Sequence, residues 1–290
     1  MLASEAPTPP QAEPGVIGRQ VGRLAVRSLY RELALDPKPG LVTPLDNGSH
    51  RDMDAGTFLR SLFALRGYFA QIATAGAANA EFERLRHLGV QAERRMLGAT
   101  GGVNTHRGAV FTLGLLAAAA GHRLARGLPP TPEAVGATVR AQWGHPILAA
   151  APRAVPATAS HGLRACRRYR VGGAREQAAQ GFPAVLETGL PALRWALERG
   201  AGEREALIHA LFSLMAEVDD TNVLHRGGQA GLRVVQSQSR SFLAAGSVLA
   251  PDWQRHARGL ARAWVARWLS PGGSADLLAA TCFVHWLDRD

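Results

Sequence analysis

Three short segments of the sequence repeat one set of polar side chains. Each segment places an amide, an imidazole and a guanidinium within five residues: Asn47, His50 and Arg51; Asn104, His106 and Arg107; Asn222, His225 and Arg226. Guanidinium groups bind phosphate oxygens through paired hydrogen bonds, and glycine turns at helix starts expose backbone N–H groups that bind them too. The second segment has such a turn at Gly101 and Gly102, and Thr105 adds a hydroxyl. The three segments predict a pocket for a ligand that carries several phosphates.

Acidic side chains accompany these segments. Carboxylates in or beside them are Asp46, Asp52, Asp54, Asp219 and Asp220. Carboxylate oxygens are the ligands that Mg²⁺ takes when it also bridges phosphates, and two adjacent carboxylates in a partly buried site need a cation nearby. Lys38 is a further candidate, because it is the only lysine among 33 basic residues and its compact charge suits a phosphate. The combination predicts a pocket for a Mg²⁺–nucleotide complex.

A structural interpretation of the same residues competes with this one. Asn and Asp beside Gly are common in turns and helix caps, so each segment alone could be a simple connection. The stretch SPGGSAD could likewise be a helix end followed by an N-cap at Ser274, and Glu93 could pair with an arginine on its own helix. Four distant segments with the same residue types favour one shared pocket over independent turns.

The elements that must hold these segments are helices. Apolar residues recur at the helical period, alanine, leucine and arginine dominate, and no stretch shows the alternation of a strand. The expected helices cover 16–35, 55–74, 79–97, 106–126, 132–149, 159–170, 174–180, 183–199, 203–217, 228–248, 252–268 and 274–288. Thr131 is expected to cap the helix that starts at Pro132. We therefore predict an all-α protein: a disordered leader over 1–15, then a single catalytic domain over 16–290 with ten to twelve helices and an active site built from the loops between them.

Composition narrows the class of protein. A net charge of +10 indicates an anionic partner, but only 6 % of the residues are aromatic, and single-stranded nucleic acids need aromatic stacking platforms. A polyphosphate ligand is favoured over nucleic acid. The longest apolar run, 109–121, is too short to span a bilayer and suits a buried helix, and the leader lacks the features of a secretion signal. We expect a cytoplasmic protein that does not contact a membrane, with a mobile connection at 151–157.

At the polar segments the chain resembles the triphosphoribosyl-dephospho-CoA synthase family. The likeness runs in order over roughly residues 16–288, and five stretches carry it: KPGLVTPLDNGSHRDMDAGTFLRS (38–61), MLGATGGVNTHRGAVFTLGLL (96–116), REQAAQGFP (175–183), DDTNVLHRGG (219–228) and SPGGSADLLAAT (270–281). The SPGGSAD ending resembles the malonate decarboxylase branch more than the citrate lyase branch. Two positions depart from the family pattern: Arg107 stands where lysine is expected, and Glu176 is out of register.

The resemblance implies a reaction in which the 2′-hydroxyl of 3′-dephospho-CoA attacks C1′ of ATP and adenine leaves. Its implied cofactor is Mg²⁺, and its product would pass to a phosphoribosyl-dephospho-CoA transferase and an acyl carrier protein. We expect Asp52 or Asp219 to act as a catalytic carboxylate and His50 or His106 as the acid–base group, with Asp54 and Asp220 on Mg²⁺. The expected substrate-binding residues are Lys38, Asn47, Arg51, Gly101, Gly102, Asn104, Thr105, Arg107, Asn222, His225 and Arg226.

Two other functions fit the residues less well. An all-α, Mg²⁺-dependent hydrolase of a ribosyl–nucleotide bond, such as an ADP-ribosyl hydrolase, would use water as the acceptor. A basic helical protein without enzymatic activity would bind nucleic acid with steep salt dependence. Scattered arginines and the concentration of His, Asp and Asn in loops disfavour the second alternative.

Overall fold

Helices account for every regular element in the part of the chain that this computed structural model describes, residues 13–150 and 160–289. The α-helices are α1 (Pro14–Leu33), α2 (Ala55–Ala77), α3 (Phe82–Ala99), α4 (Arg107–Leu124), α5 (Pro132–Ala149), α6 (His161–Tyr169), α7 (Ala174–Ala179), α8 (Leu190–Glu198), α9 (Glu203–Glu217), α10 (Thr221–Ala244), α11 (Trp253–Val265) and α12 (Gly272–Leu287). A π-helical turn, η1 (Ala184–Gly189), precedes α8, and a short 3₁₀ turn, η2 (Ser247–Leu249), follows α10. The predicted all-α fold is confirmed.

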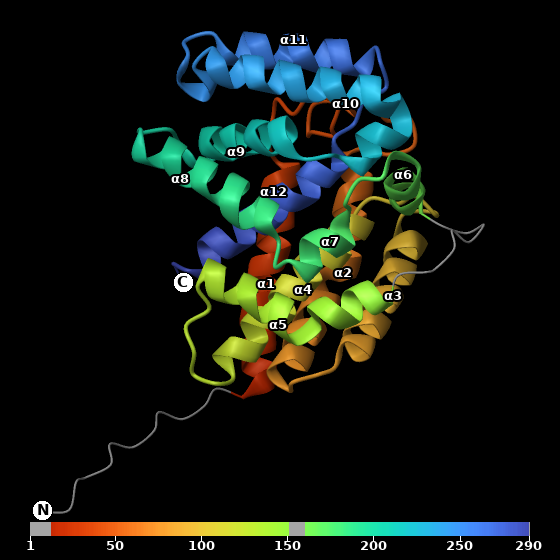
Figure 1. The fold of residues 1–290 in the computed structure, drawn as a ribbon, viewed down its shortest axis with the longest axis vertical. Coiled ribbons are helices and arrows are strands. Elements are labelled where there is room, and N and C mark those ends of the chain that lie inside the picture. The colour runs from red at the N-terminus through yellow and green to blue at the C-terminus, as the bar shows by residue number, and fades with distance from the viewer. Residues whose placement is uncertain (1–12, 151–159, 290) are drawn as a thin grey trace, which may run out of the picture.

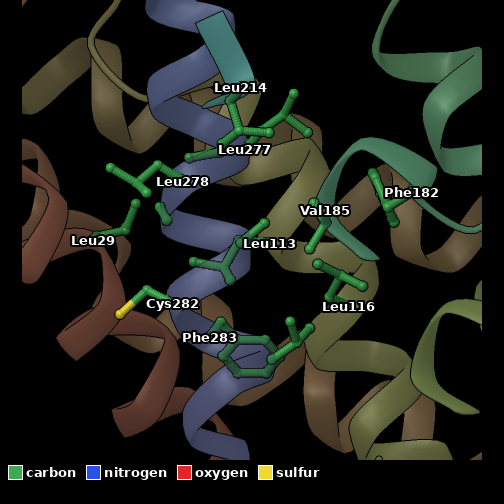
Figure 2. Close-up of a cluster of buried hydrophobic side chains, with 14 of the residues drawn as sticks. Leu29, Leu113, Leu116, Phe182, Val185, Leu214, Leu277, Leu278, Cys282 and Phe283 are labelled. Atoms are coloured by element: carbon green, nitrogen blue, oxygen red, sulfur yellow. The ribbon is translucent and has the colours of Figure 1, made fainter. Parts of the chain in front are cut away.

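Helices α4 and α12 form the centre of the bundle. Every residue of α4 from Thr112 to Gly121 is buried, which confirms the buried helix expected at 109–121. Helix α12 is equally apolar from Leu277 to His285. Figure 2 shows Leu29 of α1 and Leu113 of α4 directed at the apolar side chains of α12. Helices that are apolar on all sides must be enclosed by others, so these two carry the core.

Small residues let α2 and α4 approach closely. A Cβ on Gly76 of α2 would lie 1.9 Å from the carbonyl oxygen of Ala118 on α4, so only glycine fits there. Helix α1 packs on the same pair through its apolar face, and its predicted face residues Val21, Leu24 and Leu29 are buried. This tight three-helix unit fixes the ends of α1, α2 and α4 relative to one another.

Several helix boundaries differ from the expected ones. The backbone breaks at Gly228 (φ 60°, ψ −163°), where the expected helix over 228–248 begins, but a first helical segment, capped by the Asp220 side chain, starts already at Thr221; the two segments together form α10. Helix α12 begins at Gly272, so Ser274 is not its N-cap. Helix α1 begins inside the predicted leader, at Pro14. The rest of that leader, residues 1–12, and the connection 151–157 lie outside the described residues. The cap of α5 by Thr131 is confirmed.

The polar segments of the sequence gather at one end of the bundle. In Figure 1 the loop between α1 and α2 lies beneath α10 and α11, beside the start of α12, and far from the N-terminal end of α1. The start of α4 lies at this end as well, because it meets α12 there. Among the described helices, none combines the length and the apolar character that crossing a membrane requires.

Candidate active site

Asp220 joins the starts of two helices. One carboxylate oxygen accepts the backbone N–H groups of Asn222 and Val223 at 2.9 and 3.3 Å, which starts α10. The other accepts the backbone N–H and the hydroxyl of Ser274 in the first turn of α12, at 2.7 and 3.0 Å. The carboxyl is buried, and burial raises its pKa although the four hydrogen bonds oppose that rise. Asp220 therefore fixes α10 against α12.

The loop between α1 and α2 is hydrogen-bonded to α10 and to the segment just before α12. Arg226 of α10 donates to the carbonyl oxygen of Ser49 at 2.6 Å, and the Ser49 hydroxyl donates to the carbonyl oxygen of Leu269 at 2.6 Å. His50 contacts Arg226 through Nδ1 at 3.2 Å and the Ser270 hydroxyl through Nε2 at 2.9 Å. Three of the segments that carry the family resemblance are thus hydrogen-bonded to one another.

The contacts of His50 define its protonation. Arg226 can only donate, so Nδ1 of His50 accepts and Nε2 carries the proton that it donates to Ser270. Burial and the Arg226 charge lower the pKa of His50 to about 4, against an opposing contribution from Asp52. His50 is neutral at physiological pH with both nitrogens engaged, which makes it a poor general acid.

Lys38 is buried in an ion pair. Its ammonium donates to the Glu32 carboxylate at 2.6 Å and to the Glu32 carbonyl oxygen at 2.7 Å, and the lysine side chain is 1 % exposed. An ammonium has three donors, and no third partner of Lys38 lies among the described residues. Lys38, which we predicted to bind a phosphate, is therefore the counter-ion of the Glu32 carboxylate in this structure.

His106 lies beside this pair, at the start of α4. Its Nδ1 contacts the Ser61 hydroxyl at 2.6 Å, and Phe58 packs against it edge-on at 4.9 Å. Burial and the Lys38 charge lower the pKa of His106 to about 3. Its Nε2 and the neighbouring Thr105 hydroxyl are buried and have no hydrogen-bond partner within the described chain. Buried polar atoms are normally paired, so this pair of atoms marks a place for a ligand.

Asp276 is the acidic residue that we missed in the sequence. It lies in the second turn of α12, half-buried, and a Cβ on Gly108 of α4 would lie 1.8 Å from its carboxylate. The Ala109 backbone N–H faces it, while burial and the carboxylates of Glu32 and Asp220 raise its pKa well above the usual range. A carboxyl group in this setting keeps its proton at higher pH than an ordinary aspartate does. The signal in the sequence was a single carboxylate in front of the apolar run LLAAT.

The loop before α4 forms the open rim of this region. Gly101 and Gly102 are exposed with φ values of 66° and 89°, as expected for a glycine turn. Asn104 accepts the Arg107 backbone N–H at 3.2 Å, and Arg107 pairs with Glu93 at 3.1 Å. Glu93 therefore bridges α3 to α4 and does not pair along its own helix as the structural interpretation expected.

Other predicted residues lie on the surface of the same region. Asp52 is exposed, 3.9 Å from His50, and Asp219 is exposed where α9 meets α10, contacted by Gln236 at 3.4 Å. Arg51 lies over the Trp268 ring at 4.5 Å. The remaining three are Asn47, exposed in the loop after α1; Asn222, whose amide lies against Gly272; and His225, which stacks on His161 of α6 at 4.0 Å. Asn222, His225 and Arg226 belong to a helix, not to a loop as predicted.

The two predicted Mg²⁺ ligands both cap helices in this structure. The Asp54 carboxylate accepts the backbone N–H and hydroxyl of Thr57 at 2.7 and 2.8 Å and caps α2. Both oxygens of Asp220 are already filled by two donors each, which uses about all the lone pairs of a carboxylate. Within residues 13–150 and 160–289, no three His, Cys, Asp or Glu side chains are grouped so that they could hold a metal ion.

The site combines a carboxyl group with a raised pKa, a neutral imidazole, unpaired polar atoms and a rim of arginines. Asp276 can give a proton, His106 and Thr105 can bind a polar ligand, and Arg51 and Arg107 can meet anions at the surface. No strong nucleophile lies among these residues. The arrangement suits a reaction in which two bound substrates react with each other.

Comparisons with known proteins agree with this picture. The family model "CitG: ATP:dephospho-CoA triphosphoribosyl transferase" matches residues 18–290. A protein of Vibrio cholerae serotype O1 (strain M66-2) is 39 % identical over 295 residues, covering 99 % of this chain and 94 % of its own. A Stutzerimonas stutzeri protein is 41 % identical (99 % and 95 % covered), and one of Pseudomonas paraeruginosa is 43 % identical (93 % and 92 % covered). All three are named "Probable 2-(5''-triphosphoribosyl)-3'-dephosphocoenzyme-A synthase". No solved structure matches the chain. The chain belongs to the ATP:dephospho-CoA triphosphoribosyl transferase family, as the resemblance of its polar segments predicted, and is a transferase.

Proposed function

We propose that this transferase moves the 5-triphosphoribosyl group of ATP to the 2′-hydroxyl of 3′-dephospho-CoA and releases adenine. The family match and the names of the relatives support the class of reaction. The observation that carries the proposal is the convergence of the polar segments on one end of the bundle, around a carboxyl group with a raised pKa.

The reaction balances without any outside reactant. The bond from ribose C1′ to the adenine nitrogen breaks, and a bond from C1′ to the 2′-oxygen of dephospho-CoA forms. The hydroxyl proton leaves the acceptor, and one proton arrives on adenine. Positive charge builds on the ribose as the bond to adenine breaks, as in glycoside hydrolysis. The protein must therefore supply an acid for adenine and a negative group near the sugar.

Asp276 is the acid in this proposal. Burial first, and then the carboxylates of Glu32 and Asp220, raise the pKa of Asp276, so it keeps its proton at higher pH than an ordinary aspartate does. A positioned acid of this type contributes on the order of 10²–10⁴-fold to the rate. His50 and His106, the acid–base candidates expected from the sequence, are held neutral and take the role of positioning groups.

The exposed carboxylates supply the negative group. Asp52 and Asp219 are the candidates for stabilising the charged ribose and accepting the hydroxyl proton, because their carboxylates are not enclosed by the protein. Arg51, Arg107 and the glycine turn before α4 would hold phosphates at the rim. Mg²⁺ enters the proposal only as the ion that accompanies the ATP phosphates.

The test is an adenine-release assay with defined variants. The purified protein with ATP, Mg²⁺ and 3′-dephospho-CoA should release adenine and form an adduct heavier by the triphosphoribosyl group. Asp276→Asn should lower kcat about 10²–10⁴-fold and remove the loss of rate seen at high pH when Asp276 ionises. Asp252→Asn, at an exposed aspartate at the start of α11, is the matched control and should leave kcat unchanged. Adenine release without the acceptor would instead establish a hydrolase, and wild-type turnover in Asp276→Asn would reject the assigned acid.

We further propose that the product serves the acyl carrier protein of malonate decarboxylase and that the enzyme acts in the cytoplasm, where both substrates are made. The likeness of the SPGGSAD ending to the malonate decarboxylase branch supports the first point. To test it, the product and a phosphoribosyl-dephospho-CoA transferase are added to the acyl carrier protein of malonate decarboxylase and, separately, to that of citrate lyase, and the modification of each carrier is measured. Preferential modification of the citrate lyase carrier would overturn this assignment.

A further inference from the structure

Trp268 is an exposed aromatic residue at the edge of the candidate active site. It lies between α11 and α12, two residues before Ser270, and it is 43 % exposed. Trp264, one helical turn earlier, is fully buried and donates to Gln238. The two tryptophans thus differ in burial although they are only four residues apart.

The backbone around Trp268 is held by residues of the site. Its φ of 57° is an outlier for a bulky side chain, and such conformations persist only when the surroundings enforce them. Here Arg226 donates to the Trp268 carbonyl oxygen at 3.4 Å, and Ser49 donates to that of Leu269 at 2.6 Å. The same contacts that assemble the site thus hold the indole out at its edge.

The indole of Trp268 has a cation partner but no ring partner. The Arg51 guanidinium lies over the ring at 4.5 Å, and no second ring or cation contacts Trp268 among the described residues. Trp195 on α8 provides a contrast, because Arg199 lies over it at 4.2 Å and His209 also stacks on it at 4.6 Å. Trp195 carries both a cation and a stacked ring, whereas Trp268 carries the cation and lacks the ring.

We propose that the exposed indole of Trp268 stacks against the adenine base of a substrate, with Arg51 on the face away from the base. The inference rests on the proposed function, in which both substrates, ATP and 3′-dephospho-CoA, contain adenine. Planar bases stack well on aromatic side chains whatever their sequence or attachment. The cation on the far face strengthens the pair, and Arg51 lies close to the phosphates that any adenine nucleotide brings with it.

Equilibrium binding measures how much stacking on Trp268 contributes to the affinity for an adenine ligand, independently of turnover. Dissociation constants are determined by calorimetry for ATP alone and for 3′-dephospho-CoA alone, with wild-type protein, Trp268→Ala and Trp268→Phe. Inorganic triphosphate and 4′-phosphopantetheine serve as probes without a base. Trp268→Ala should raise the Kd of one adenine ligand about 10- to 100-fold and leave the base-free probes unchanged. The ligand affected identifies which adenine occupies the site, and Trp268→Phe should retain most of the affinity.

Trp195→Ala is the matched control, because it removes an exposed tryptophan beneath an arginine elsewhere on the surface; it should change none of the four constants. Unchanged affinity of Trp268→Ala for both adenine ligands would overturn the inference, and so would an equal loss for the base-free probes. Adenine release by the wild type separates this failure from failure of the proposed function. If the wild type transfers the ribosyl group and Trp268→Ala binds normally, only the stacking site is wrong. If Trp268→Ala weakens the binding of one adenine ligand but the wild type transfers nothing, only the proposed function is wrong.

Discussion

Replacing Lys38 by methionine should destabilise the protein by about 3–5 kcal/mol, the usual cost of leaving a buried charge without its partner. The structure supplies the reason. Lys38 Nζ and the Glu32 carboxylate are 2.6 Å apart, with side chains 1 % and 7 % exposed. At an effective dielectric constant of about 20, the attraction at that distance is about 6 kcal/mol. Burial removes several kcal/mol of hydration from each ion. In the intact pair the attraction roughly offsets this loss, whereas the Glu32 carboxylate left alone by Lys38→Met has no such compensation.

Unfolding in urea, followed by circular dichroism, measures this loss. The double variant Glu32→Gln/Lys38→Met should regain most of the lost stability, because neither charge is then buried. Arg86→Met is the matched control: Arg86 and Glu83 are also 2.6 Å apart, but both are exposed, so stability should hardly change. Two results would contradict the buried ion pair. One is a loss of stability in Lys38→Met no larger than that in Arg86→Met; the other is a loss in the double variant equal to the sum of the losses in Glu32→Gln and Lys38→Met.

Two further predictions concern the site and its response to pH. Gly108→Ala should lower kcat by at least tenfold with little loss of stability, because its Cβ would displace the Asp276 carboxylate; adenine release and urea unfolding check this, and unchanged kcat would contradict the geometry. Burial lowers the pKa of His50, His106 and His209 to about 4, 3 and 4. At pH values below about 6.5, these histidines therefore bind protons in the unfolded state but not in the folded state. For each such histidine, the free energy of unfolding falls by about 1.4 kcal/mol for every unit by which the pH drops. Stability should fall as pH drops from about 6.5 to 4, although Asp220 and Asp276, with raised pKa values, release protons on unfolding and reduce the slope. In urea unfolding between pH 6 and 5, the free energy of unfolding of His209→Asn should depend on pH less steeply than that of the wild type, by about one proton. An identical pH dependence would refute the shift.

The helices could be predicted because their signals are local. Apolar residues at the helical period marked the buried face of α1, the continuous run at 109–121 marked the enclosed α4, and Thr131 with Pro132 marked the start of α5. The first segment of α10, before the break at Gly228, was missed because two glycines at 227 and 228 suggested a loop. Asp220 had the residue type of an N-cap, and its second partner, Ser274, lies 54 residues away.

The site was predicted less completely, because its chemistry depends on long-range neighbours. The gathering of the polar segments was expected, but the roles of individual residues were not. Lys38 looked like a free cation until Glu32 was placed beside it, and His106 looked like an acid until burial was taken into account. The pKa of Asp276 is raised by burial and by the carboxylates of Glu32 in α1 and Asp220 before α10, so nothing adjacent in the sequence distinguishes it from an ordinary helical aspartate.

The burial of Lys38 has a practical consequence. It is the only side-chain amine in a protein with 33 basic residues, and it is enclosed at the end of the bundle where the polar segments meet. Amine-selective acylating reagents therefore find no accessible lysine on the folded surface. The rate at which such a reagent modifies Lys38 reports how often this end of the molecule opens, and a ligand that holds it closed should slow the modification. The chain thus carries a built-in reporter of opening at a single position, with no label to introduce.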